Sequence, residues 1–110
     1  MIASGDSMMD VARDLKKRKA NRIFVCSTFG LFTSGLDRFD KAFEEGLFYR
    51  LVTTNLIYQS EELLSKPYYI SADMSKYIAL IIDTLNHDQS ISDLLSPTER
   101  IHNILKQYQN

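Results

Sequence analysis

The sequence contains no tryptophan, two prolines, four glycines and one cysteine, Cys26, in 110 residues. With so little proline and glycine, it is neither a collagen-like nor a low-complexity chain. A single cysteine cannot close a disulfide within the chain, and a lone thiol suits a reducing compartment. We therefore exclude a disulfide scaffold and expect a cytoplasmic protein.

Long apolar runs and an excess of one charge are also absent. No stretch approaches the roughly 18 apolar residues of a membrane helix, and the amino terminus lacks the layout of a signal peptide. The net charge is −1, so no overall field attracts nucleic acid or anionic lipid. We expect neither a membrane partner nor a nucleic-acid partner.

Apolar residues at helical spacing alternate with short apolar runs along the chain. This alternation is typical of a parallel sheet with right-handed crossovers. It predicts an α/β fold, with a three-stranded, mainly parallel sheet and an additional C-terminal helix. The expected helices span about 8–19, 34–45, 74–85 and 96–108, the strands 23–26, 47–53 and 68–70, and a helical turn 61–64.

Several local signals make these elements more specific. Ile23–Cys26 is apolar throughout, as in strands buried on both faces of a sheet. Lys16–Lys19 follows the first helix, and we interpret it as a solvated last turn rather than a nucleic-acid patch. Ser96–Glu99 forms a capping box with proline at the first helical position. The last helix is expected to bury Ile101, Ile104, Leu105 and Tyr108.

The strongest local candidate for binding is the loop Ser4–Ser7, which runs directly into the first helix. Small residues let backbone N–H groups turn toward an anion, and the helix adds partial positive charge. The serine hydroxyls can add further donors. From these residues alone, an N-cap at Ser7 behind a frayed tail remains the simpler interpretation.

Other catalytic signatures are missing from the sequence. There is no Cys/His cluster of the kind that binds zinc, no nucleophile elbow and no Walker loop. His87 and His102 stand alone in polar surroundings and are expected to be surface residues. The sequence by itself therefore indicates no catalytic residue.

Taken together, four segments resemble the ribose-phosphate pyrophosphokinases, the enzymes that make phosphoribosyl pyrophosphate. The resemblance covers about residues 1–95, and all four segments stand in the family's order. These residues correspond to only the last part of the family's C-terminal, phosphoribosyltransferase-like domain. The segments are Met1 with the loop Ala3–Ser7, Thr28–Thr33, Val52–Asn55 and Ser90–Leu94.

The resemblance implies a Rossmann-like, partial phosphoribosyltransferase-type domain over residues 1–95, with residues 96–110 as a helix packed on it. It implies that Ala3, Ser4, Gly5, Asp6 and Ser7 bind ribose 5-phosphate or phosphate weakly. It assigns Ser90 and Ser92 to part of a regulatory phosphate site. ATP and Mg²⁺ belong to the full-length enzyme, which transfers pyrophosphate from ATP to ribose 5-phosphate. No cofactor and no catalytic residue are expected in this segment.

Three positions depart from the family's pattern. Ala3 replaces the acid of the loop, Asp6 replaces its glycine, and Phe29 replaces a histidine. A carboxylate at position 6 repels phosphate unless it turns away to cap the helix. The loss of the histidine removes any polar role at position 29.

Three functional interpretations remain open at the level of sequence. In the first, the chain is a piece of a pyrophosphokinase that is inactive alone and begins at an internal methionine. In the second, it is a non-catalytic phosphate-binding, regulatory or oligomerisation module. In the third, it is another phosphoribosyltransferase. The Thr28–Thr33 and Ser90–Leu94 segments disfavour the third. Without the family's preceding strand, a strand edge and the apolar faces of Met8–Leu15 and Ile23–Val25 lack cover, which predicts a homo-oligomer.

Overall fold

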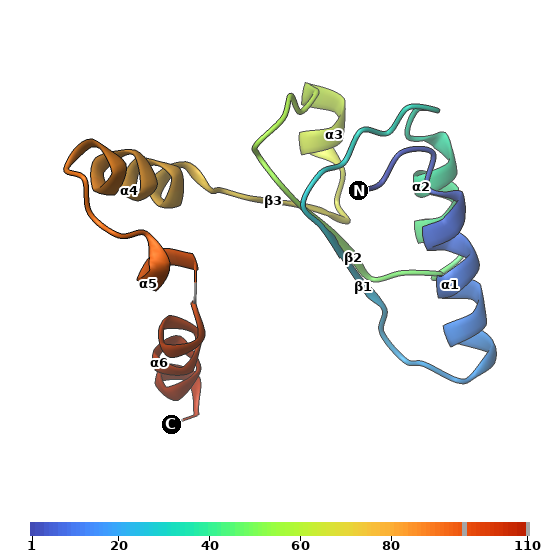
Figure 1. The fold of residues 1–110 in the computed structure, drawn as a ribbon. Helices are drawn as coiled ribbons and strands as arrows, with labels where there is room; N and C mark the ends of the chain where they lie inside the picture. Colours follow the sequence, from blue (N-terminus) through green and yellow to red (C-terminus); the bar gives the residue numbers. More distant parts are fainter. Residues whose placement is uncertain (96, 110) are drawn as a thin grey trace. The chain divides into compact units, whose positions relative to one another are not determined.

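The computed structural model describes residues 1–95 and 97–109, and the chain divides into two compact units, Met1–Met74 and Ser75–Asn110. The first unit alternates helices and strands, and the second contains helices (Figure 1). The elements of the first unit are α1 (Asp6–Lys17), β1 (Phe24–Ser27), α2 (Asp37–Glu44), β2 (Arg50–Thr54), α3 (Glu61–Ser65) and β3 (Tyr69–Ala72).

The three strands form one parallel sheet in the order β1-β2-β3. In its register, Val25 lies beside Leu51, and Leu51 lies beside Tyr69. The start of the chain adds an isolated parallel bridge between Ile2 and Gly30, beyond the end of β1. The predicted α/β fold with a three-stranded parallel sheet is therefore confirmed.

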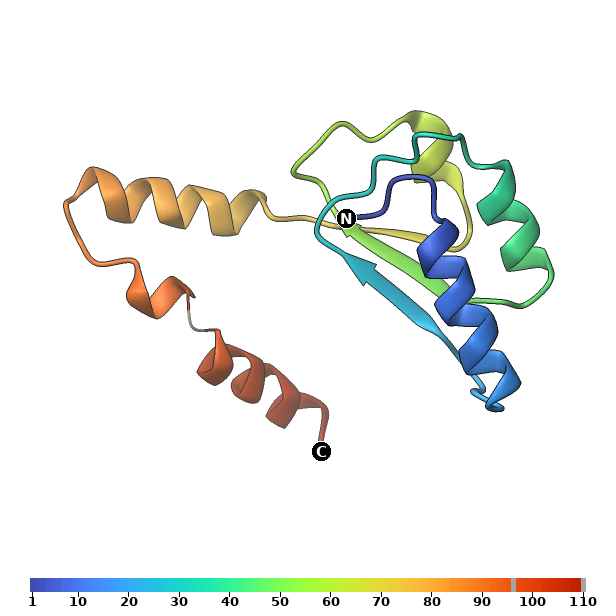
Figure 2. The ribbon, with the colours of Figure 1, turned by 45° about the vertical axis from the view of Figure 1, so that its right-hand side comes forward.

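One face of the sheet is covered by helices. α1 and α2 lie side by side over it in both views (Figures 1 and 2), and α3 adds Leu63 to the same core. This covered face carries Leu51 and Tyr69, which are 0% and 8% exposed, and the buried Thr53. The helices contribute Met9, Ala12, Phe39 and Ala42 to the core.

The opposite face, here called the open face, has no such cover within the first unit. Phe24 is 57% exposed and Ile70 46%, Cys26 is exposed, and Val52 is half-buried. The prediction that Ile23–Cys26 is buried on both faces is therefore wrong. Its apolar residues alternate, with Ile23 buried and Phe24 exposed, because the helices of the first unit lie over only one side.

The helix ends match the sequence signals in part. α1 begins at Asp6 with Gly5 as its N-cap, without a side-chain cap, so the prediction of a cap at Ser7 is wrong. Gly46 at φ 71° terminates α2 as predicted, and its N–H donates to the carbonyl of Phe43. The predicted turn near Glu61 is confirmed as α3, where the Ser60 hydroxyl accepts from the N–H of Leu63 at 3.1 Å.

The second unit consists of α4 (Ser75–Asn86), α5 (Ser92–Leu95) and α6 (Thr98–Tyr108). The Tyr77 hydroxyl donates to the carbonyl of Leu94 at 2.7 Å and so connects α4 with α5. Pro97 is the N-cap of α6 rather than its first residue, and no side chain caps the helix. The predicted capping role of Ser96 lies outside the described residues.

The apolar stripe of α6 exists, but it is exposed. At least half of each side chain in this stripe is accessible within the second unit, and their burial against the first unit stays a prediction: Ile101, Ile104, Leu105 and Tyr108. The predicted division at residue 95, with 96–110 packed on the first domain, stays a prediction. No helix within the described residues is long and apolar enough to cross a membrane.

Candidate functional site

The loop Ala3–Ser7 lies beyond the carboxyl end of β1, where α/β proteins commonly bind ligands. The bridge from Ile2 to Gly30 places it there, and the Ala3 carbonyl accepts from the N–H of Thr33 at 3.1 Å. Residues 1–8 line a small hollow of about 150 Å³. The loop is therefore held against the sheet edge by backbone bonds.

Gly5 is required at the centre of this loop. Its φ of 88° is in the left-handed region, which disfavours any side chain. A Cβ at this position would also lie 2.4 Å from the ring of Phe39. The loop can turn into α1 so closely over the core only because residue 5 is glycine.

The start of α1 leaves backbone donors available. In the part of the chain that the structure describes, the N–H groups of Ser7 and Met8 have no hydrogen-bond acceptor, as is usual in a first helical turn. The Asp6 N–H reaches the Ser4 hydroxyl at 3.4 Å, which is a weak contact. These N–H groups and the serine hydroxyls can donate hydrogen bonds to an anion.

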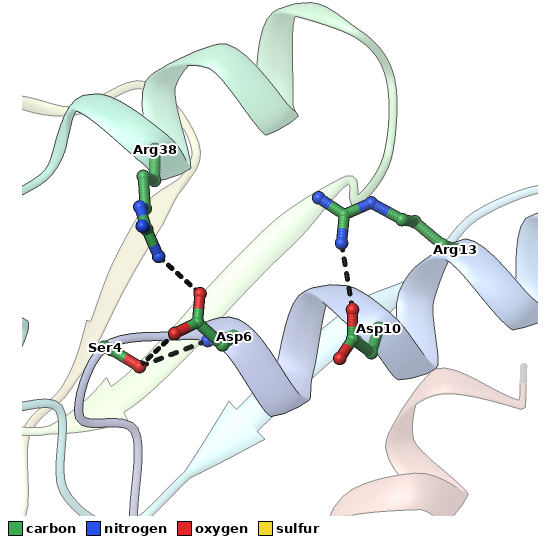
Figure 3. A network of polar contacts seen from close by, with 5 residues as sticks. All are labelled: Ser4, Asp6, Asp10, Arg13 and Arg38. Atoms are coloured by element: carbon green, nitrogen blue, oxygen red, sulfur yellow. Dashed lines mark hydrogen bonds and ion pairs between the residues drawn. The ribbon is translucent and has the colours of Figure 1, made fainter.

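The Asp6 side chain does not cap α1, and its carboxylate has hydrogen-bond and ion-pair partners in the protein. Its carboxylate accepts from the Ser4 hydroxyl at 2.9 Å and forms an ion pair with Arg38 of α2 (Figure 3). Both side chains of this pair remain more than half exposed, so water weakens their attraction. Arg38 therefore neutralises the carboxylate that the sequence places beside the loop.

A second carboxylate on α1 provides a comparison. Asp10 accepts from Arg13 at 3.0 Å on the outer surface of the same helix (Figure 3). This pair is also exposed, but it does not touch the loop. Asp10 and Asp6 therefore differ in position relative to the loop rather than in their chemistry.

The second and third segments of the resemblance lie at the same edge of the sheet. Gly30 is in the bridge with Ile2, and Phe32 packs edge-on against Phe39 with ring centroids 5.0 Å apart. Asn55, which follows β2, donates to Asp73 and accepts from the N–H of Met74, both at 2.9 Å. The fold thus brings three of the four segments together in the first unit.

Ser90 and Ser92 lie in the second unit. Their hydroxyls are 2.8 Å apart, and the Ser90 hydroxyl accepts from the N–H of Ser92 at 3.3 Å. This is the geometry of a serine turn at the start of α5. The regulatory phosphate role of the two serines stays a prediction.

A polar network that the sequence did not indicate connects α2 with the segment between α3 and β3. Asp40 accepts from Lys66 at 2.6 Å and from the Tyr68 hydroxyl at 2.8 Å. Burial opposes ionisation of Asp40, but these two bonds outweigh it and lower the pKa of its carboxyl. Burial, followed by the bond to Asp40, raises the pKa of the Tyr68 hydroxyl.

Lys66 is the cation of this network. The hydrogen bond with Asp40 raises the pKa of the Lys66 ammonium, with Glu62 as a second acidic neighbour at 3.6 Å. Lys66 and Tyr68 thus share Asp40 as their partner, and burial together with these structural contacts accounts for the three pKa shifts. The sequence held no signal for this network, since its members are up to 28 residues apart.

Within residues 1–95 and 97–109 there is no group of three or more His, Cys, Asp or Glu side chains that could hold a metal ion. Arg38 was also missed at the sequence level, because its partner Asp6 lies 32 residues earlier.

Comparison with known proteins identifies a relative of known name. No protein-family model matches the sequence. The chain is 33% identical over 94 residues to human phosphoribosyl pyrophosphate synthase-associated protein 2. The match covers 86% of this chain and 25% of that protein, so the chain spans about a quarter of the relative's length. Together with the α/β fold, this similarity supports a relation to the phosphoribosyl pyrophosphate synthase family.

Proposed function

We propose that this chain is a non-catalytic module that associates with phosphoribosyl pyrophosphate synthase and binds phosphate groups weakly through the loop Ala3–Ser7. The observation that carries the proposal is the similarity to a protein named for its association with that synthase. Association is preferred over pyrophosphokinase activity, because the resemblance assigns ATP, Mg²⁺ and the catalytic groups to parts of the enzyme outside this segment.

The loop supports weak phosphate binding in two ways. The N–H groups of Ser7 and Met8 point from the first turn of α1 without an acceptor among the described residues, and helix amino termini favour anions. Arg38 neutralises Asp6, which reduces the repulsion of a second anion. The Asp6 carboxylate nevertheless competes with phosphate for Arg38 and for the Ser4 hydroxyl.

Association can be tested by mixing the purified chain with purified phosphoribosyl pyrophosphate synthase at micromolar concentration. Size-exclusion chromatography with light scattering should show a complex heavier than the synthase alone. Separate elution at all ratios would contradict the proposal. Formation of phosphoribosyl pyrophosphate from ATP and ribose 5-phosphate by the chain alone would contradict its non-catalytic character.

Phosphate binding can be tested by titrating ribose 5-phosphate while the amide NMR signals of Gly5 and Ser7 are followed. Both should shift at millimolar ligand. Asp6→Asn removes the competing charge and leaves Arg38 available, and we expect binding to tighten about threefold to tenfold, or about 0.7–1.4 kcal/mol. Asp10→Asn is the matched control and should leave the affinity unchanged. Absence of shifts in both the wild type and Asp6→Asn would refute the binding role.

Self-association accompanies this proposal. The uncovered apolar residues of the first unit, among them Phe24 and Ile70, favour a homo-oligomer when no partner is present. Light scattering of the isolated chain should give a mass above that of one chain. A single-chain mass at high concentration would exclude self-association but not binding to the synthase.

A further inference from the structure

The segment that follows β1 holds the start of the chain by an irregular pairing. The N–H of Ile2 donates to the carbonyl of Phe29 at 2.9 Å, and the N–H of Leu31 donates to the carbonyl of Ile2 at 2.8 Å, as in a regular parallel ladder. The next bond runs from the N–H of Thr33 to the carbonyl of Ala3 at 3.1 Å. Carbonyls of two consecutive residues thus bind N–H groups that are two residues apart.

Phe32 is the extra residue of this pairing. In a regular parallel ladder both strands advance by two residues from one such bond to the next, but here the start of the chain advances by one, from Ile2 to Ala3. An extra residue of this kind bends the chain, as in a β-bulge. The backbone of Phe32 has a φ of 49°, in the left-handed region that an aromatic residue rarely adopts. The irregular pairing is therefore accompanied by backbone strain at Phe32.

The packing of the Phe32 ring offsets this strain. The ring lies edge-on against Phe39, with centroids 5.0 Å apart, and against Tyr69, with centroids 6.2 Å apart. It also folds back over Gly30, where an added Cβ would lie 2.6 Å from it. Such ring pairs stabilise a core beyond the area that they bury. A strained backbone persists where the surrounding structure holds it, and for Phe32 these ring contacts do so.

Phe39 extends this packing to the loop Ala3–Ser7. Its ring lies against Gly5 so closely that an added Cβ there would collide with it. Gly5 is the N-cap of α1, while the carbonyl of Ala3, two residues earlier, is held by the segment that contains Phe32. The Phe32–Phe39 pair therefore braces both ends of the turn that leads into the helix.

We infer that Phe32 positions the loop Ala3–Ser7 for anion binding without touching the anion itself. Its left-handed backbone draws the Ala3 carbonyl onto the segment after β1, and its ring braces Phe39 beneath the loop. Donors bind an anion more tightly when they are held in place before it arrives. All of these contacts lie within the first unit, Met1–Met74. The effect on binding rests on the proposed function, whereas the bracing of the loop does not.

A phenylalanine that only fills the core should behave differently, and Phe43 provides the comparison. It is also half-buried and also packs against two rings, those of Phe48 and Tyr68. It belongs to α2, and its carbonyl accepts from the N–H of Gly46 at the end of that helix. Loss of either ring should destabilise the first unit, but only loss of the Phe32 ring should loosen the loop.

Hydrogen exchange of the Thr33 amide in the full chain measures the bracing directly, because this N–H bonds to the Ala3 carbonyl. Phe32→Val removes the ring and disfavours the left-handed backbone, so the amide should exchange at least about tenfold faster than in the wild type. Phe32→Asn removes the ring but tolerates the left-handed backbone, and its exchange should be intermediate. Phe43→Val is the matched control and should change the exchange of Thr33 by less than about twofold.

Titration with ribose 5-phosphate, followed by the amide NMR signals of Gly5 and Ser7, measures the consequence for binding. Phe32→Val should weaken binding at least about fivefold, and Phe43→Val should leave it within about twofold of the wild type. Circular dichroism verifies that each variant is folded at the temperature of the titration. If Phe32→Val does not fold, Phe32→Leu and Phe43→Leu replace the pair, since leucine keeps most of the buried volume, and the expected loss is about threefold.

Three results would overturn the inference. The first is exchange of the Thr33 amide that is no faster in the Phe32 variant than in the wild type, and the second is an equal effect of the Phe32 and Phe43 variants on the loop. The third is undiminished affinity in a Phe32 variant whose Thr33 amide exchanges faster, since the loop would then bind without being braced. If the wild type itself shows no amide shifts with ribose 5-phosphate, the proposed binding role fails, and the exchange of Thr33 alone decides whether Phe32 braces the loop.

Discussion

The two faces of the sheet consist of alternate residues of the same strands, but their environments differ. Leu51 and Tyr69 lie under helices and are 0% and 8% exposed, whereas Phe24 and Ile70 on the other face are 57% and 46% exposed. Both sets are apolar, so strand composition alone does not decide which face is covered. The covered face should provide most of the stability of the first unit, and the open face its capacity for association.

The largest expected effect tests whether the faces differ in energy. Leu51→Ala should lower the free energy of unfolding by about 3 kcal/mol, because it opens a cavity in the covered face. Ile70→Ala on the open face should cost about 1 kcal/mol or less, since half of its side chain is already in water. Urea denaturation of both variants measures the difference. Equal losses would show that the open face is covered in solution.

The loop above the covered face gives the next effect. Gly5→Ala should cost about 2–3 kcal/mol, since it combines a left-handed backbone with a collision against Phe39. Gly46→Ala is the matched control: its φ is also positive, at 71°, but no atom lies within 4 Å of the added Cβ. It should cost only about 1 kcal/mol. Similar unfolding temperatures of the two variants would show that the collision with Phe39 does not contribute to the loss of stability.

The Asp40 network should stabilise the covered side in a pH-dependent way. Asp40→Asn should cost about 1–2 kcal/mol at neutral pH, because two bonds lose their charge. The folded pKa of Asp40 is below its ordinary value of 3.8, so the contribution is present above pH 3.8 and is lost as the pH falls through the folded pKa. Urea denaturation at pH 7 and in acid should therefore show the variant converging with the wild type. A constant difference across this range would contradict the assignment.

The smallest stability effect is expected on the open face. Phe24→Ser should lower the free energy of unfolding by only about 1 kcal/mol, because more than half of the side chain is already in water and little more than its contact with Tyr49 is lost. It should clearly reduce the fluorescence of a dye that binds exposed apolar surface. A stability loss comparable with that of Leu51→Ala would instead indicate that Phe24 belongs to the core.

The order of the elements could be predicted because it depends on local patterns. Alternating apolar runs indicated three strands and their parallel arrangement, and Gly46 marked a helix end. The environment of the strands could not be predicted in the same way. The run Ile23–Cys26 records apolar character but not the position of the helices, so the exposure of Phe24 was missed.

The site shows a similar division. The glycine in the loop Ala3–Ser7 and its position before α1 are local features, and the sequence indicated both. The state of Asp6 depends on Arg38, which folding brings from a different helix. The contact of the Arg22 guanidinium with the Tyr49 ring, 4.9 Å from its centre, likewise depends on residues that lie far apart in the chain. Partners distant in sequence leave no periodic signal.

Asn55 has a mechanical consequence. Its side chain binds Asp73 and the N–H of Met74 at the exit of β3, so β2 holds the last residues of the first unit by side-chain bonds as well as by the strand ladder. A pull transmitted through residue 75 would load these two bonds before it could peel β3 from the sheet. Asn55 thus adds two side-chain bonds to the strand ladder at the point where the chain leaves the first unit.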